Sequence, residues 1–370
     1  MKVLHVDTGR EWRGGQQQVL YLTQGLEDRG VTSVVVTPQG SPLAQRLRAR
    51  SLPLIEIPYS APYAPRTIRA LQRILADRSY EILHLHTSHA HTLGFLSFRL
   101  PPRRAFQKPV FLVSRRVDFR PGSDPISKLK YTASGQHIVC VSEAIRQILL
   151  DYGVAEKSLS VVRSGVVVPD SVSSLERSRL RETLGVPSDA PLVGAIGQLV
   201  PHKGHRHLLS AFAIVRRSVP NAHLVVIGEG ELLKTLESKT RELGIEGAVT
   251  WAGYRARAAR YLDALDLFVH PSVEEGLGTS ILDAGARRVA IVATRAGGIP
   301  ETIKHRETGI LVEPGQADSL ALEMVGLLLD PGRRAELGQA AREWVGRQRS
   351  EVRMIEQSLA LYRSLAGSAR

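Results

Sequence analysis

The sequence predicts an α/β fold with two domains, each built on a parallel sheet. Short apolar runs rich in Val and Ile alternate with amphipathic stretches of helical length, which is typical of buried parallel strands joined by helices. The alternation pauses once, at a stretch rich in Ser, Pro and charge, and then restarts. A chain of 370 residues is also long for a single core. We therefore expect two doubly wound, Rossmann-like halves of similar size.

The individual elements follow from the spacing of apolar residues. The predicted strands are Val3–Val6, Ser33–Thr37, Ile82–Leu85, Val110–Val113, Ile138–Val141, Leu192–Ile196, Leu224–Ile227, Ala248–Trp251, Leu267–His270 and Ala290–Thr294. The predicted helices are Gln16–Arg29, Pro65–Arg78, Glu143–Tyr152, Arg206–Ser218, Leu232–Leu243, Thr279–Arg287, Ser319–Leu329 and the tail Arg333–Leu365. This order places the domains at residues 1–170 and 190–345, with a linker over 171–189.

Composition excludes several classes of protein. Hydrophobic residues make up 43% and charged residues 23%, which is ordinary for a globular chain. The lone Cys140 excludes a disulfide framework. No apolar run approaches the ~20 residues of a membrane span, and the first residues do not resemble a signal peptide. We therefore expect a cytoplasmic protein.

The net charge of +13 predicts an anionic partner. Residues 1–170 carry 23 Lys and Arg against 13 Asp and Glu, so most of the excess lies in the first half. The segment Phe98–Lys108 and the helix Pro65–Arg78 combine apolar and basic residues and suit contact with an acidic membrane. The alternative is a solvated loop and an ordinary half-buried helix.

Ligands of open parallel sheets bind beyond the carboxyl ends of the strands, so the loops there are the candidate sites. The first such loop contains Trp12, Gly14 and Gly15 and leads into a helix. Glycines let a ligand approach the backbone, and a helix N-terminus offers free N–H groups to a phosphate. A purely structural turn would have the same residues.

Two loops of the second half have similar features. One runs from Gly197 and Gln198 to Lys203-Gly204 and can aim an ammonium group at a diphosphate, although it lacks the P-loop spacing. The other is the tight turn Gly228-Glu229-Gly230. For the first loop, an exposed loop lysine is an equally good interpretation. The second, taken alone, is mostly a structural turn.

The loop after Leu267–His270 carries the strongest signal. Glu275 is followed by Gly276, Leu277, Gly278 and Thr279 at the start of a helix, and Asp283 comes eight residues after Glu275. Eight residues are a little over two helical turns, so we expect the two acids on one helical face. Acids that accept hydrogen bonds from sugar hydroxyls, with free amides between them, suit a phosphorylated sugar.

Four histidines could form a metal site. His84 and His86 alternate on a predicted strand, and His89 and His91 follow in the next loop or helix start. Such a set suits Zn²⁺. We favour acceptor-side or structural histidines over a metal centre.

The run HPSVEEGLGTSILDAGARRVAIVATRAGGIPETI resembles the signature of GT-B glycosyltransferases of group 1, family 4. Further motifs match in order along nearly the whole chain: the Gly14-Gly15 loop, Val141–Glu143, Val161–Gly165, the Gly197–Gly204 element and Gly228–Gly230. The resemblance implies two facing Rossmann-like domains, with a C-terminal helix, about 346–370, that crosses back to the first.

The resemblance also implies roles for residues. Glu275 would contact the donor sugar, Asp283 the nucleotide ribose, and Lys203 the diphosphate, helped by amides near Leu277–Thr279. The reaction would be retaining transfer from a UDP-, GDP- or ADP-sugar without a metal or other cofactor. Catalysis is assigned to Glu275, Lys203 and Arg115. The donor-binding candidates are Gly14, Gly15, Gln198, Lys203, Gly228, Gly230, Tyr254, Glu275, Gly276, Leu277, Gly278, Thr279 and Asp283. The acceptor-side candidates are Trp12, His86, His89, Arg115 and Arg116.

Three departures from the family pattern stand out. The second acid is Asp283 where the family has Glu, and Gln198 stands where an Arg is frequent, so His202 is a candidate substitute. Ser114-Arg115-Arg116 occupies a place where many members have a His. These arginines suit a charged acceptor or the donor phosphate.

The favoured function is synthesis of a cell-surface polysaccharide or lipopolysaccharide on a glycan or lipid-linked acceptor, at the inner face of the plasma membrane. A nucleotide-sugar epimerase of the same fold is one alternative. A non-catalytic protein that binds anionic membranes or nucleic acid is another, although the chain shows no nucleic-acid-binding signature, so we expect no nucleic-acid partner.

Overall fold

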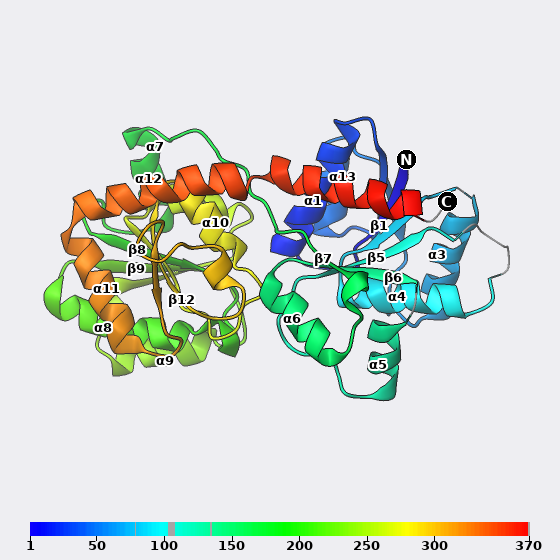
Figure 1. The fold of residues 1–370 in the computed structure, drawn as a ribbon. Coiled ribbons are helices and arrows are strands. Elements are labelled where there is room, and N and C mark those ends of the chain that lie inside the picture. Colours follow the sequence, from blue (N-terminus) through cyan, green and yellow to red (C-terminus); the bar gives the residue numbers. More distant parts are fainter. Residues whose placement is uncertain (78, 103–107, 134, 369–370) are drawn as a thin grey trace. The chain divides into compact units, whose positions relative to one another are not determined.

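The computed structural model describes residues 1–77, 79–102, 108–133 and 135–368. The chain separates into two compact units, one of Met1–Gly165 together with Glu351 onward, the other of Val166–Ser350. In each unit, helices cover both faces of a central sheet (Figure 1). Among the described residues, neighbouring strands of both sheets pair in parallel, which confirms the predicted class of two Rossmann-like domains.

The first unit has a seven-stranded sheet in the order β3-β2-β1-β4-β5-β6-β7. Its strands are β1 Lys2–Val6, β2 Thr32–Pro38, β3 Leu54–Ile57, β4 Ile82–Leu85, β5 Val110–Arg115, β6 Gln136–Cys140 and β7 Leu159–Val161. Its helices are α1 Gly14–Glu27, α2 Pro42–Arg48, α3 Pro65–Asp77, α4 Ser88–Arg99, α5 Pro125–Thr132, α6 Glu143–Tyr152 and, from the chain's end, α13 Glu351–Ser368; Glu156–Ser158 is a short 3₁₀ helix.

Helix α13 belongs to the first unit because its apolar side packs beside α1. Met354, Ile355, Leu359 and Tyr362 are buried in one cluster with α1 and alternate residues of four strands. Gly25 of α1 makes room for this contact, since a Cβ there would lie 2.2 Å from Ile355 Cδ1. Each buried side chain of this size contributes roughly 1.5–3 kcal/mol, so α13 is an integral part of the unit.

The second unit has a six-stranded sheet in the order β10-β9-β8-β11-β12-β13. Its strands are β8 Leu192–Ile196, β9 His223–Ile227, β10 Val249–Gly253, β11 Leu267–His270, β12 Ala290–Thr294 and β13 Ile310–Val312. Its helices are α7 Ser174–Leu184, α8 His205–Ser218, α9 Leu233–Glu242, α10 Thr279–Ala286, α11 Ala317–Leu329 and α12 Pro331–Gln348, with 3₁₀ helices at Pro201–Lys203, Glu246–Ala248, Ala258–Ala264 and Ile299–Glu301.

Alternation along the strands divides the second unit's core between the two faces of its sheet. Leu224 and Val226 join the cluster with α8 and α11, whereas Val225 and Ile227 join the one with α7 and α10. Strands that are apolar on both faces are what a parallel sheet between two helix layers requires. In both sheets the strand order reverses at the centre, between β1 and β4 and between β8 and β11, and ligands of such folds bind at that reversal.

The predicted linker and tail differ from the structure. The segment 171–189 contains α7, whose Leu180 and Leu184 are buried in the second unit's core, so it is part of that unit. The tail is two helices and not one, because the backbone at Arg349 and Ser350 pairs with Val166, which ends α12. The predicted return helix therefore begins at Glu351, and residues 369–370 lie outside the described part.

Of the two segments that we expected to contact an acidic membrane, one has its apolar side buried. Helix α3 buries Ile68, Leu71 and Leu75 in the first unit, so its apolar side is not available to a bilayer. Part of the other segment, residues 103–107, lies outside the described residues. Within the described part of the chain, no helix is both long and apolar enough to cross a membrane.

Candidate functional site

The candidate site of the second unit lies at the reversal between β8 and β11. Because these strands are parallel neighbours, the loops after their carboxyl ends meet at one edge of the sheet. The backbone ties the loops together, since Val273 N–H donates to the carbonyl of His202 at 2.8 Å. Gly204, at a φ of 68°, lies so close that a Cβ there would be 2.0 Å from the Pro271 carbonyl oxygen.

Lys203 and Glu275 meet across these two loops. The Lys203 ammonium lies 2.5 Å from Glu275 Oε2, and their side chains are 19% and 13% exposed. Burial alone would raise the pKa of Glu275, but the hydrogen bond with His270 and the charge of Lys203 outweigh it and hold the pKa well below its usual range. Glu275 is therefore an anion throughout the physiological range of pH.

Two further side chains contact Glu275 and a third contacts one of these two; the sequence interpretation did not assign them a role. His270 Nε2 lies 2.9 Å from Glu275 Oε2, and the Ser272 hydroxyl lies 3.4 Å from the same oxygen. The other ring nitrogen of His270, Nδ1, lies 3.3 Å from Ser280 Oγ. The signal that could have found them is their position, because His270 ends the central strand β11 and Ser272 follows it.

The start of α10 at Thr279 agrees with the predicted helix Thr279–Arg287. Because Glu275 lies in the loop before this helix, the expectation that Glu275 and Asp283 share a helical face is wrong. Gly278 precedes the helix with a φ of 82° and gives no side-chain cap, and Gly276 and Leu277 are buried. The first amides of α10 therefore have no acceptor within the helix.

Asp283 lies within α10, half-buried. Loss of hydration raises the pKa of its carboxyl to about 6, against the opposing charge of Arg287 four residues on. A carboxyl with few protein partners in a site of this kind is suited to accept hydrogen bonds from a ligand.

Some of the remaining donor-binding candidates in this unit pack against another loop, whereas Tyr254 is exposed. Gly228 and Gly230 pack against the loop after β8, where Cβ atoms would lie 1.9 Å from the Gly197 oxygen and 2.4 Å from the Leu199 oxygen. Their lack of side chains therefore serves the packing of two loops. Tyr254 is 48% exposed, and Gln198 accepts from His205 Nε2 through its backbone oxygen at 3.0 Å.

In the first unit, Gly14 and Gly15 form the start of α1, as predicted for a loop-to-helix transition. The helix has no side-chain cap and no acid in its first turn. Trp12 packs near α2, and the Arg46 guanidinium carbon lies 3.9 Å from the centre of its ring.

The two adjacent arginines after β5 have different surroundings. Arg115 is 4% exposed, bonds the Tyr131 hydroxyl at 2.6 Å and the Phe119 carbonyl, and lies over both rings. Arg116 lies near the α1 start, with its Cδ 3.7 Å from where a Cβ of Gly15 would be. Arg116 is thus better placed than Arg115 to meet a ligand.

The four histidines of the predicted set do not lie together in the structure. His84 and His86 lie with His5, and one ligating nitrogen from each is within 4.8 Å of the others. His91 instead bonds Gln136 at 3.0 Å, and His89 is exposed on α4. Burial and then the charge of Arg116 lower the pKa of His5 to about 3, and a divalent cation would meet the same repulsion. This charge favours acceptor-side or structural histidines over zinc.

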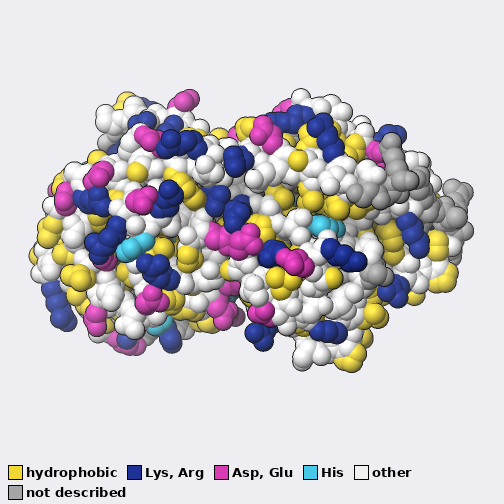
Figure 2. All heavy atoms as spheres, in the orientation of Figure 1, with side chains coloured by type: hydrophobic (Ala, Val, Ile, Leu, Met, Phe, Trp, Pro, Cys, Tyr) yellow, Lys and Arg dark blue, Asp and Glu magenta, His cyan; other side chains and the backbone are white. Residues whose placement is uncertain are grey.

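The surface charge is mixed on the face shown in Figure 2. Lys and Arg side chains are interspersed with Asp and Glu over both units there.

Two family models match this chain, Glycosyltransferase Family 4 over residues 12–168 and Glycosyl transferases group 1 over residues 176–344. The structure of Anabaena Alr3699/HepE in complex with UDP-glucose has a TM-score of 0.86 at 21% identity and covers 98% of this chain and 100% of that chain. The fold is that of the GT-B glycosyltransferases. The chain itself belongs to the group 1 glycosyltransferases.

Two curated relatives have a higher sequence identity than the Anabaena structure but cover less of the chain. A GDP-mannose-dependent alpha-(1-6)-phosphatidylinositol monomannoside mannosyltransferase of Mycobacterium tuberculosis is 35% identical over 49% of this chain and 48% of that protein. The lipopolysaccharide core biosynthesis glycosyltransferase LpsE of Rhizobium meliloti is 28% identical over 70% of this chain and 71% of that protein. The chain thus spans about half the length of the mannosyltransferases that it matches.

Proposed function

We propose that the protein is a retaining glycosyltransferase that moves a sugar from a nucleotide-sugar donor to a glycan or lipid-linked acceptor. The observation that carries this proposal is the contact of Lys203 with Glu275 at the reversal of the second sheet. It joins a cation suited to a diphosphate and an anion suited to sugar hydroxyls at the place where the fold binds ligands. Membership of the group 1 glycosyltransferases supports it.

Each group has a proposed task in transfer. The Lys203 ammonium and the first amides of α10 stabilise the charge that develops on the leaving diphosphate, so no metal ion is needed. Glu275 accepts hydrogen bonds from the donor sugar, and Asp283 accepts them from the ribose. Gly14, Gly15 and Arg116 act from the first unit on the donor phosphate or the acceptor.

A donor panel tests the proposal. The relatives' names point to different donors, GDP-mannose for the mannosyltransferase and UDP-glucose for the Anabaena structure, so UDP-, GDP- and ADP-sugars belong in the panel. We expect release of one nucleotide only when an acceptor is added, a product with the donor's anomeric configuration, and no loss of rate with EDTA. Absence of binding at about millimolar donor, or an inverted product, would contradict it.

We further propose that the acceptor belongs to cell-surface polysaccharide or lipopolysaccharide synthesis at the inner face of the plasma membrane. The name of the Rhizobium relative supports this pathway. Exposed Arg66, Arg69 and Arg73 on α3 provide charge for acidic lipid headgroups. Sedimentation with anionic and with zwitterionic vesicles tests it. Binding should require the anionic lipid and weaken when the three arginines become glutamine.

A further inference from the structure

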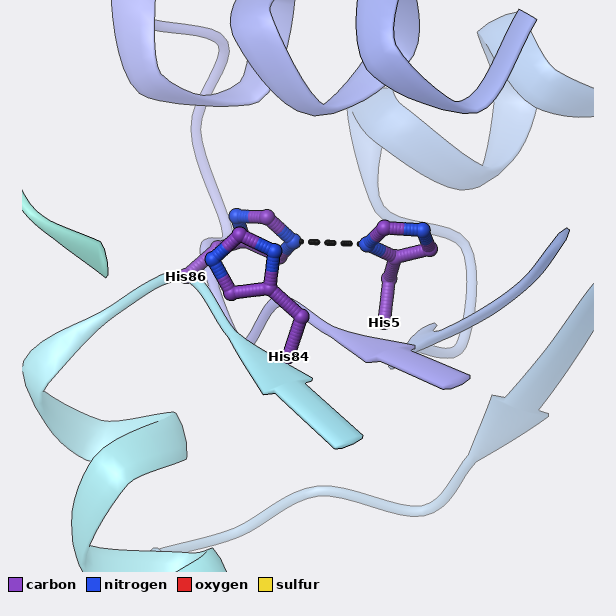
Figure 3. Close-up of side chains that lie close together, drawn as sticks. All are labelled: His5, His84 and His86. Atoms are coloured by element: carbon purple, nitrogen blue, oxygen red, sulfur yellow. Dashed lines mark hydrogen bonds between the residues drawn. The ribbon is translucent and has the colours of Figure 1, made fainter. Parts of the chain in front are cut away.

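A row of imidazoles lies at the reversal of the first sheet. His5 of β1 and His84 of β4 are register partners and follow the buried Val3 and Ile82 on the side of α1 and α13. Figure 3 shows the His84 and His86 rings side by side, with His5 facing His86 across a hydrogen bond. That bond joins His5 Nδ1 and His86 Nε2 at 2.9 Å, and all three rings are buried.

Arg116 determines where the protons of this row sit. Its two terminal nitrogens, which can only donate, lie 3.5 Å from His86 Nδ1, and one of them lies 3.3 Å from the His86 carbonyl oxygen. A proton on Nδ1 would face these N–H groups, so Nδ1 presents its lone pair to Arg116. His86 therefore carries its proton on Nε2 and donates it to His5 Nδ1, which places the His5 proton on Nε2.

The three imidazole rings are neutral, and hydrogen bonds also fix His84. Burial comes first among the causes that lower the pKa of His84 and His86 well below the usual value, and neighbouring imidazoles and Arg116 add to it. His84 bonds Ser114 Oγ at 2.8 Å through Nε2 and the Tyr362 hydroxyl at 2.5 Å through Nδ1. The charged groups around the row are Arg116 and Asp7, the latter bonded by Gln16.

From this placement of protons on the ring nitrogens, we propose that His86 is a positioning residue that holds Arg116 beside the start of α1. It does not take a proton from the acceptor. With Nδ1 directed at Arg116 and Nε2 protonated, His86 has no free lone pair for an acceptor hydroxyl. Arg116 Nε is buried without a partner among the described residues, so its terminal nitrogens carry its interactions. This inference rests on the proposed function, since it concerns the same reaction.

Nitrogen NMR of protein labelled at histidine tests the proton order without any transfer reaction. We expect His5 and His86 as neutral Nε2–H tautomers that do not titrate between about pH 6 and pH 8. A His86 with its proton on Nδ1, or one that titrates in this range, would overturn the proposal. This measurement stays decisive even when no sugar is transferred, which would count only against the proposed function.

Paired substitutions test the role in transfer. Asparagine places its carbonyl oxygen near the position of Nδ1, so His86→Asn keeps an acceptor for Arg116 whereas His86→Ala does not. We expect His86→Asn to retain about tenfold more kcat than His86→Ala, with an unchanged acid limb in the rate–pH profile. Equal losses together with disappearance of an acid limb would establish His86 as a proton acceptor. His137→Asn is the matched control, because among the described residues His137 bonds Ser160 alone, at 2.8 Å, and its rate should equal the wild type.

Discussion

Lys203 and Glu275 are 72 residues apart in the chain and lie 2.5 Å apart at the edge of the second sheet. Neither side chain reaches this contact by local structure, because each stands in a different loop after a different strand. The contact exists because β8 and β11 are neighbours in the sheet. A donor diphosphate would compete with Glu275 for the same ammonium group, so binding and charge pairing are linked at this point.

Breaking this pair should affect both activity and stability. We expect Glu275→Gln to lower kcat by about 10²–10³, because it removes charge aimed at the reacting sugar. Lys203→Ala should raise the donor KM and cost about 2 kcal/mol of unfolding free energy, since it removes the cation paired with the largely buried Glu275 carboxylate. Kinetics and urea unfolding measure these effects. Lys304→Ala, which breaks an exposed pair with Glu307, is the control and should change stability by less than about 0.5 kcal/mol.

Asp283 should make stability depend on pH. Its pKa is raised from an ordinary value of 3.8 to about 6 in the folded protein, so the folded state binds the extra proton between these values and stability falls as pH rises through that range. Asp283→Asn should therefore gain about 1–2 kcal/mol over the wild type above pH 6, and nothing below about pH 4. Urea titrations at several pH values measure this. A gain that is equal at all pH values would contradict the assignment.

The same carboxyl should make donor binding depend on pH. Protonated Asp283 accepts hydrogen bonds from ribose hydroxyls less well, so the wild-type donor KM should rise as pH falls below about 6. Asp283→Asn should raise the KM at neutral pH and remove this dependence. Initial rates over a range of donor concentrations and pH values distinguish the two proteins.

Gly228 and Gly204 should not tolerate a side chain. Alanine at either position adopts an unfavourable positive φ and places its Cβ within about 2 Å of a backbone oxygen. We expect each variant to lose more than about 3 kcal/mol or to fail to fold. Gly326→Ala is the matched control, since nothing lies within 4 Å of its Cβ position in α11, and it should gain about 0.5–1 kcal/mol. Thermal unfolding ranks the three variants.

Tyr362 should contribute through its hydroxyl as well as its ring. Tyr362→Phe leaves the buried His84 Nδ1 without its partner, so we expect a loss of about 1–3 kcal/mol. Ser358→Ala removes another buried hydroxyl of α13, but that hydroxyl donates to the helix's own backbone at Met354, so its loss should cost less than about 1 kcal/mol. Equal losses in the two variants would show that the contact with His84 contributes nothing.

The sequence predicted the central elements well and the marginal ones poorly. Strands Leu192–Ile196 and Leu267–His270 are confirmed to the residue, because buried central strands are continuous apolar runs. Strands β3, β7 and β13, which lie at the edges of the two sheets, were not predicted. The break before α13 was missed because it depends on pairing with the distant Val166.

The residues of the candidate site were likewise predicted only in part from the sequence. Lys203 and Glu275 could be singled out because each occupies a glycine-containing loop after a strand, yet only the strand order brings them together. His5 was overlooked since a lone histidine in an apolar strand resembles core. The sequence nevertheless indicates which face of the sheet His5 occupies. His5 follows Val3 by two residues, and this period places both side chains on the same face.

The placement of α13 has a consequence for biosynthesis. The second unit is continuous, from Val166 to Ser350, whereas the first unit is completed only by the segment from Glu351 onward. The first unit therefore lacks Met354, Ile355, Leu359 and Tyr362 until that segment has been synthesised and has left the ribosome. Until then α1 exposes the apolar surface that these residues cover, and His84 Nδ1 lacks the Tyr362 hydroxyl. The first unit thus cannot finish folding before the second unit has been synthesised, and a nascent chain stalled after Ser350 would expose that apolar surface to chaperones.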